Sequence, residues 1–216
     1  MSSNMSRVGT WEIGEIKFPF SEAVRFSLEN IKKRFTRAAI TAASVVLGIA
    51  FMNSLMMMAA INQQVSGMGG IELYQYWLLF ISLLVCAVGI TNSMLIAVTE
   101  RYKEIGTWKT LGALDKHVLE LFLIEASLIG LIGGLVGYIA GLVAAVIYGA
   151  VFQGAPMDKI SSAFFGTKMV PLPLPTAPAL LVLSLVVAVG ISLAASLYPA
   201  YKGAKLEPAV AFRFEV

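Results

Sequence analysis

The sequence has little of what most catalytic sites are built from. Its 216 residues include one histidine, His117, and one cysteine, Cys86, and only 13% are charged. Cys86 stands in an apolar run, where it has no partner for a disulfide and no second metal ligand. His117 precedes another apolar run, and we interpret it as an exposed interfacial residue rather than half of a Ser-His or Cys-His pair. We therefore expect no enzyme active site and no metal site.

The sequence also has no G-x-x-x-x-G-K-[ST] loop. The backbone N–H groups of such a loop hold the phosphates of ATP, so the chain is not expected to bind ATP itself. We expect no other cofactor and no nucleic-acid partner.

Apolar residues dominate instead: 58% of the residues are hydrophobic and the mean hydropathy is +0.80. Crossing a bilayer core of about 30 Å takes about 20 apolar residues. Runs of that kind occur near 38–61, 77–99, 118–150 and 178–199. The sequence therefore predicts an all-α, polytopic membrane protein with four transmembrane helices. The first run lies far from Met1, so we do not expect a cleaved signal peptide.

Basic residues predict the orientation. They gather before the first run, between the second and third, and after the fourth, at Arg25, Lys32, Lys33, Arg34, Arg37, Arg101, Lys103, Lys109, Lys116, Lys202, Lys205 and Arg213. Residues 62–76 carry none and residues 151–177 carry two. The positive-inside rule then places both termini and the middle loop in the cytoplasm. Tyr74, Tyr76 and Trp77 would mark the outer interface, and Tyr198 and Tyr201 the inner one.

The chain divides into three predicted parts: a cytoplasmic N-terminal segment 1–37, a permease domain 38–199, and a cytoplasmic tail 200–216. Val24, Leu28, Ile31 and Phe35 recur at helical spacing, which predicts an amphipathic helix lying on the inner leaflet. This helix would anchor the chain to anionic lipid or bind a partner, and the residues alone leave both open.

Small and polar residues interrupt the predicted spans. The third span carries glycines at close-packing intervals, at Gly130, Gly133, Gly134, Gly137 and Gly141. They predict a tightly packed neighbour, in the same chain or in a second copy. Asn53, Ser54, Thr91, Asn92 and Ser93 would hydrogen-bond between helices or line a substrate path. Glu125 lies near the start of the third span and is either a functional carboxylate or an interfacial, bundle-facing one.

Residues 101–114, between the second and third spans, predict a short amphipathic helix. Ile105, Trp108 and Leu111 would form its apolar face, while Arg101, Glu104 and Lys109 would remain in solvent. Such a helix at the cytoplasmic surface would dock a partner protein or rest on lipid.

Three blocks resemble the FtsX-like permeases of the MacB type, the membrane subunits of type VII ABC transporters. They are TERYKEIGTWKTLGA, LFLIEASLIGLIGGLVGYIAG and the closing YPAYKGAKLEPAVAFRFE. The resemblance implies that residues 101–114 are a coupling helix that docks a cytoplasmic ATPase. Its residues would be Glu100, Arg101, Glu104, Ile105, Gly106, Trp108, Leu111 and Gly112. Glu125 matches the family's glutamate in the next span, and Pro199, Pro208 and Arg213 match the terminal block.

The resemblance further implies that ATP and Mg belong to the ATPase, and that two permeases pair as a homodimer or heterodimer in the inner membrane. Family members usually carry a large extracytoplasmic domain between spans one and two, whereas about 15 residues join them here. The implied function is coupling ATP hydrolysis to transport or to mechanotransmission, with a possible extracytoplasmic partner. The alternatives are an ATP-independent transporter or channel, and a membrane scaffold for a partner protein.

Overall fold

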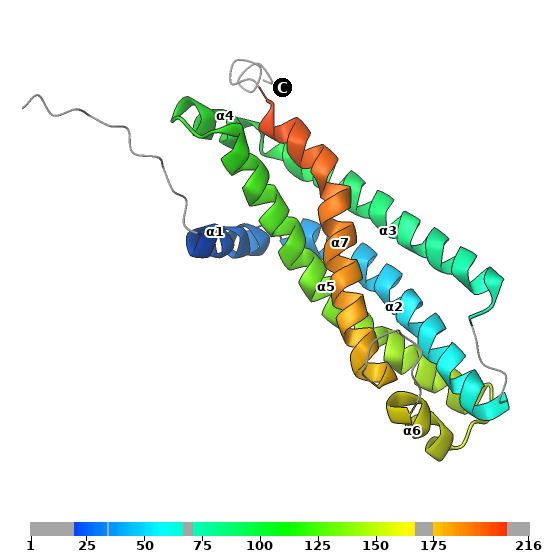
Figure 1. The fold of residues 1–216 in the computed structure, drawn as a ribbon. Coiled ribbons are helices and arrows are strands. Elements are labelled where there is room, and N and C mark those ends of the chain that lie inside the picture. The colour runs from blue at the N-terminus through cyan, green and yellow to red at the C-terminus, as the bar shows by residue number, and fades with distance from the viewer. Residues whose placement is uncertain (1–19, 34, 67–70, 167–174, 207–216) are drawn as a thin grey trace, which may run out of the picture.

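The computed structural model describes residues 20–33, 35–66, 71–166 and 175–206 (Figure 1). The helices in these ranges are α1 (Phe20–Lys33), α2 (Phe35–Ser66), α3 (Leu73–Glu100), α4 (Tyr102–Thr110), α5 (Asp115–Val151), α6 (Met157–Gly166) and α7 (Thr176–Ala204). All the regular structure in the described residues is helical, which confirms the predicted all-α class.

Four of these helices, α2, α3, α5 and α7, are long and apolar enough to cross a membrane, which confirms the prediction of four spans. Each begins before and ends after its apolar run, because helical hydrogen bonding continues through polar residues at the ends. Helix α3 begins with a side-chain cap, in which the N–H of Glu72 donates to Oε1 of Gln75 at 2.9 Å.

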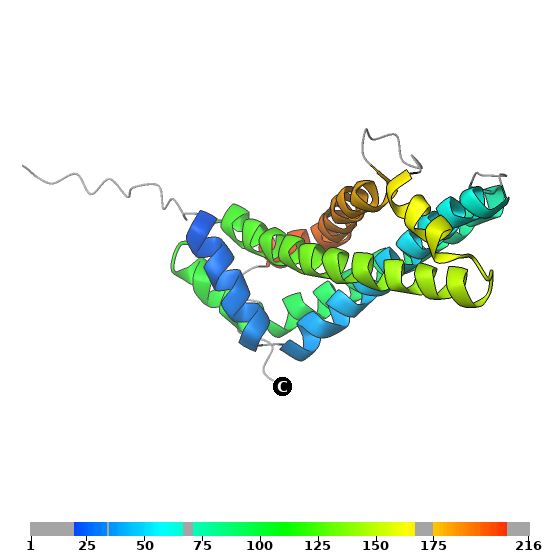
Figure 2. The same ribbon diagram turned by 90° about the horizontal axis from the view of Figure 1, so that it is seen from below.

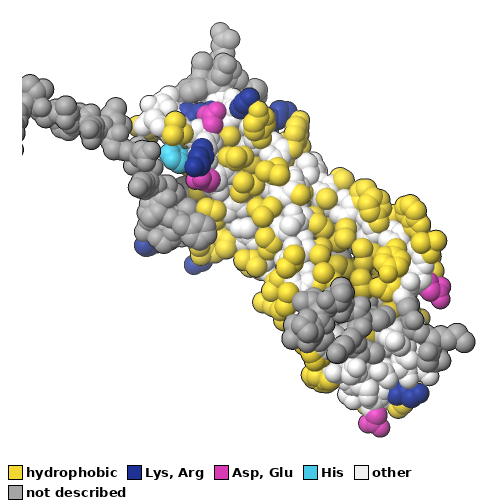
Figure 3. Space-filling model, viewed as in Figure 1, with side chains coloured by type: hydrophobic (Ala, Val, Ile, Leu, Met, Phe, Trp, Pro, Cys, Tyr) yellow, Lys and Arg dark blue, Asp and Glu magenta, His cyan; other side chains and the backbone are white. Residues whose placement is uncertain are grey.

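Helix α5 lies in the middle of the bundle and has its most extensive contacts with α2 and α7, while α3 packs against the same two helices. Helix α4 lies at one end of the bundle and α6 at the other, and we call these the α4 end and the α6 end (Figure 1). Hydrophobic side chains cover the flank between the ends, and charged side chains gather at the ends (Figure 3). This distribution suits a bundle surrounded by lipid.

Helix α1 is not aligned with the bundle. It lies across the bundle near the α4 end and contacts α5 and the start of α2 (Figure 2). Arg25, Glu29 and Lys32 are exposed, whereas Ile31 is half-buried. The predicted amphipathic helix is therefore present, with part of its surface packed on the bundle.

Helix α6 was not predicted from the sequence. Ile160 and Ala163, three residues apart, are buried, and the helix packs mainly on α2. Asp158 in its first turn suits the positive end of the helix dipole. This spacing and the preceding Pro156 were the available signals, but the segment is too short for a convincing hydrophobic pattern.

The glycines of α5 form two contact lines within the chain. Gly133, Gly137 and Gly141 face α2, where a Cβ on Gly141 would lie 2.5 Å from the backbone oxygen of Ala50. Gly130 and Gly134 face α7 at Ser192 and Ala188. The neighbours that the sequence left open are thus α2 and α7 of the same chain, and we call these contacts the glycine seam.

Candidate functional site

Helix α4 has a buried inner face. Ile105 is fully buried, within an apolar cluster that includes Val98, Phe122 and Ala204. Gly106 is also buried and Trp108 is half-buried. Three of the eight predicted coupling residues are therefore buried and do not face outward: Arg101, Ile105 and Gly106.

The outer face of α4 and the turn that follows are exposed. The exposed residues are Lys103, Glu104, Thr107, Thr110, Leu111, Gly112 and Leu114, and we call them the α4 outer face. Leu111 is 78% exposed and Leu114 63% exposed, so two large apolar side chains project at the tip of the bundle. Exposed apolar side chains next to charged ones are typical of a surface that binds another protein.

Gly112 shapes the turn from α4 into α5. Its φ of +96° is in the left-handed region, which favours glycine. The N–H of Gly112 donates to the carbonyl of Lys109 at 3.0 Å, and the N–H of Ala113 to the carbonyl of Trp108 at 2.9 Å. These two bonds form a Schellman motif, which satisfies carbonyls at the end of the helix. Gly112 therefore sets the position of Leu111 and Leu114.

Arg101 is buried, which corrects the prediction that it remains in solvent. It stands between α3 and α4 and is 2% exposed, while Glu125 of α5 is 6% exposed. Nη1 of Arg101 donates to Oε2 of Glu125 at 2.7 Å, and Nη2 donates to Oε1 at 3.1 Å. The guanidinium carbon also lies 5.7 Å from the ring centroid of Phe122. This bidentate geometry is strong and directional, so Glu125 is a paired carboxylate that faces the bundle.

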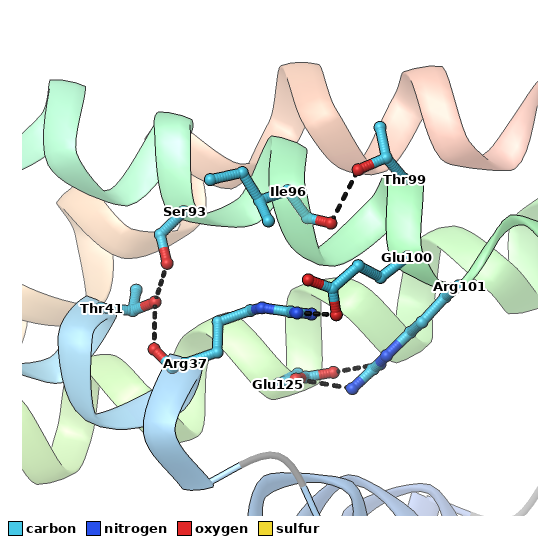
Figure 4. A network of polar contacts seen from close by, with 8 residues as sticks. All are labelled: Arg37, Thr41, Ser93, Ile96, Thr99, Glu100, Arg101 and Glu125. Carbon is cyan, nitrogen blue, oxygen red and sulfur yellow. Dashed lines mark hydrogen bonds and ion pairs between the residues drawn. The ribbon is translucent and has the colours of Figure 1, made fainter. Parts of the chain in front are cut away.

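Glu100, the residue before Arg101, pairs with a different helix. Its carboxylate pairs with Arg37 near the start of α2 (Figure 4). One turn further along α2, the hydroxyl of Thr41 donates to the carbonyl of Arg37 at 3.1 Å and also contacts the hydroxyl of Ser93 in α3. The start of α2 is thus joined to α3 through a continuous set of polar contacts.

Lys109 holds the other end of α4. Its Nζ donates to the carbonyl of Leu206, after α7, at 2.9 Å and lies 2.8 Å from Oδ1 of Asp115 at the start of α5. The side chain of Lys109 is only 10% exposed, so it too is not the freely solvated side chain that was predicted. Lys205 precedes Leu206 in the chain, and a hydrogen bond with Tyr201 raises its pKa. Helix α4 is therefore fixed to α5 and to the end of α7.

Pro199 lies inside α7, where proline provides no N–H for the carbonyl of Ala195 four residues earlier. The hydroxyl of Thr91 in α3 lies 3.1 Å from that carbonyl and 2.9 Å from the carbonyl of Ala87 in its own helix, and its one hydrogen serves both. A threonine on a neighbouring helix thus replaces the missing backbone donor, as happens in membrane helices. The sequence shows Thr91 and Pro199 but does not show that they lie close together, because they are 108 positions apart. Pro208 and Arg213 lie outside the described residues.

The chain resembles known transporter proteins over part of their length. It is 38% identical over 128 residues to the macrolide export ATP-binding/permease protein MacB of Neisseria gonorrhoeae, covering 59% of this chain and 17% of that protein. It is 44% identical over 71 residues to the uncharacterized ABC transporter permease YknZ of Bacillus subtilis, covering 33% of this chain and 18% of that one. The chain thus spans less than a fifth of the length of these relatives.

The model of the FtsX-like permease C-terminal family matches residues 76–208. This range contains α4, α5, α6 and α7 and nearly all of α3, and it is more than half of the 216 residues. Each of the two ion pairs at the corner between α3 and α4 has at least one of its two residues within this range. The chain therefore belongs to the FtsX-like permease family.

Proposed function

We propose that the chain is the membrane permease subunit of an ABC transporter. A separate cytoplasmic ATPase binds ATP and Mg, docks on the α4 outer face, and drives movement of the spans for transport or mechanotransmission. One observation carries this proposal: α4 is fixed to the bundle by its inner face and both ends, while Leu111 and Leu114 remain exposed. A helix held in this way transmits an applied force rather than absorbing it.

The charge distribution supports a cytoplasmic α4 end in the inner membrane. Arg101, Lys103, Lys109 and Lys116 lie at this end, whereas Lys159 is the sole basic residue of α6. An excess of basic residues marks the cytoplasmic side. Exposed Tyr74, Tyr76 and Trp77 at the start of α3 suit the opposite, outer interface. Both termini are then cytoplasmic.

The proposal includes pairing with a second permease. Within the most apolar 18-residue stretch of each helix, 22% of α3 is buried, compared with 50% of α2. Helix α3 therefore has a large surface that no other helix of the chain covers. Asn92 is exposed on α3, and an amide in lipid favours a hydrogen-bonding partner. In a Cys86→Ala background, Asn92→Cys should cross-link two copies in membranes, whereas Ile139→Cys on the exposed face of α5 should not. Equal cross-linking of both variants would count against this interface.

Any extracytoplasmic partner would meet the α6 end. The connection between α2 and α3 is short, since α2 ends at Ser66 and α3 begins at Leu73. Phe152, Met157 and Phe165 are exposed at this end and offer an apolar surface. An amphiphilic substrate or an external protein would therefore contact this surface.

The test is co-purification of the tagged chain from its native membrane, followed by identification of the bound proteins. We expect an ATPase with a G-x-x-x-x-G-K-[ST] loop. Glu104→Lys and Leu111→Asp should each lower the amount of bound ATPase at least tenfold, because both alter the α4 outer face. Glu120→Lys is the matched control, since Glu120 is exposed near the same end but lies on α5.

Full ATPase binding in both α4 variants would overturn the docking role. Purification of the unaltered chain without any ATPase would overturn the permease proposal and would favour a scaffold.

A further inference from the structure

The corner between α3 and α4 carries two consecutive charged side chains that pair with different helices. Glu100 reaches Arg37 of α2, and Arg101 reaches Glu125 of α5 (Figure 4). Both partners stand on helices other than the two that the corner connects, so the corner is fixed to α2 and to α5 by side-chain contacts.

Helix α4 is joined to α3 through a break in the helical backbone at Arg101 and to α5 through a side-chain pair. Arg101 has φ −99° and ψ 8°, so the helix is interrupted there, and its N–H donates to the carbonyl of Val98 at 3.1 Å. By contrast, the planar guanidinium of Arg101 is held by both oxygens of Glu125, which fixes orientation as well as distance. The pair between Lys109 and Asp115 adds a second link to α5 at the far end of α4.

Helix α5 is also suited to pass a displacement onward. At the glycine seam a Cβ on Gly137 would lie 3.0 Å from the backbone oxygen of Val46, and one on Gly130 would lie 3.1 Å from that of Ala188. Glycine has no side chain, so at these positions the backbone of α5 lies directly against α2 and α7. Displacing α5 therefore displaces its neighbours, because close-packed contacts deform little.

We propose that the Arg101–Glu125 pair makes α4 and α5 move as one body, so that displacement of α4 is delivered to α5 rather than to α3. This inference rests on the proposed docking of an ATPase on α4. Arg101 and Glu125 are positioning residues, since both are buried and neither reaches the α4 outer face. Nucleotide-driven movement of the ATPase then changes the position of α5 relative to α3 at the α6 end.

The experiment uses the chain with its co-purified ATPase in lipid nanodiscs. Spin labels at Leu73→Cys and Val151→Cys, in a Cys86→Ala background, report the distance between the outer ends of α3 and α5. Both positions are exposed and lie far along the chain from α4. Trapping the ATPase with ATP and vanadate should change this distance in the otherwise unaltered complex.

The decisive variant is Arg101→Met combined with Glu125→Leu. Replacing both members of a buried pair with apolar residues leaves no unpaired charge, so the bundle should still fold. The distance change should fall at least fivefold while the ATPase remains bound at the same stoichiometry and still hydrolyses ATP. Lys116→Met with Glu120→Leu is the matched control, because it removes an exposed pair from α5, and it should leave the change intact.

Glu125→Asp is the second variant, in case the double replacement does not fold. It keeps both charges but shortens the reach of the carboxylate, so the distance change should fall at least twofold. An unaltered distance change in the folded double variant, or in Glu125→Asp, would overturn the inference. Loss of the ATPase from the double variant would also overturn it, by reducing the pair to a structural role, as would a trapped wild-type complex with no change. If no ATPase co-purifies at all, the proposed function itself fails.

Discussion

Two regions of this bundle hold helices together by opposite means. At the corner between α3 and α4, long charged side chains reach across to α2 and α5. At the glycine seam there are no side chains on α5 to reach, and the backbones approach instead. The corner stabilises the fold through matched charges, whereas the seam stabilises it through shape.

This difference predicts how each region responds to substitution. An ion pair is sensitive to the loss of one partner but tolerates the loss of both, because the cost comes from an unpaired buried charge. A backbone contact is sensitive to any added atom, because the opposing carbonyl cannot move away without moving its helix. Substitutions can therefore separate the two kinds of contact by their pattern as well as by their size.

The largest effect is expected for Glu125→Leu. It leaves Arg101 buried without its carboxylate, and we expect a loss of about 3 to 5 kcal/mol in the free energy of unfolding. Equilibrium unfolding of the purified protein in mixed micelles measures this loss. Adding Arg101→Met should recover most of it.

Glu120→Leu is the control for that prediction, because Glu120 pairs with Lys116 at the surface. We expect it to cost less than about 1 kcal/mol, as exposed pairs usually do. If Glu125→Leu is no more costly than this control, the buried pair does not hold the corner.

The next effect is expected for Gly141→Ala. The added Cβ would lie 2.5 Å from the backbone oxygen of Ala50 and 2.6 Å from Cβ of Asn53, so α2 and α5 must separate. We expect a loss of about 1 to 3 kcal/mol, measured by the same unfolding experiment. The matched control is Gly190→Ala in α7, where a Cβ meets nothing within 4 Å. That variant should be unchanged or more stable by about 1 kcal/mol, and equal losses in both would contradict the seam.

The two regions also differ in how far the sequence predicted them. Glycines at intervals of four on an apolar helix predict close approach of another helix, since helical periodicity places them on one face. The spacing does not identify the neighbouring helices, since one of them, α2, lies before α5 in the chain and the other, α7, lies after it. The structure identifies both. Hydropathy likewise predicted all four spans, because the bilayer demands long apolar runs wherever the helices lie in the bundle.

The corner was predicted less well, and the reason is physical. The prediction from the spacing of Ile105, Trp108 and Leu111 considers α4 as an isolated helix. On such a helix Arg101 and Lys109 lie on the polar side. In the structure Arg101 lies at the break before α4, and its partner Glu125 is 24 residues away in sequence. Leu111 lies beyond the last helical residue and is exposed. Local periodicity cannot reveal a contact that only the packing of α5 creates.

The smallest effect is expected for Thr91→Val, which tests a third kind of contact that belongs to neither region. Its hydroxyl serves the carbonyl of Ala195 that Pro199 leaves without a backbone donor. We expect a loss of about 1 kcal/mol in the free energy of unfolding, the scale of interhelical hydrogen bonds in membranes. Thr91→Ser keeps the hydroxyl and should lose less.

A double-mutant cycle separates this hydrogen bond from simple packing. In a Pro199→Ala background the backbone gains an N–H at position 199, which can donate to the carbonyl of Ala195 within α7 itself. Thr91→Val should then cost distinctly less than it does beside Pro199. If the cost is the same in both backgrounds, Thr91 contributes through its packing or through its bond to the carbonyl of Ala87, which lies at 2.9 Å in its own helix. A smaller cost of Thr91→Val in the Pro199→Ala background would mean that α3 stabilises α7 at its proline through a hydrogen bond. Helix α3 would then contact its neighbour through a polar side chain, whereas α5 contacts its neighbours through the backbone of its glycines.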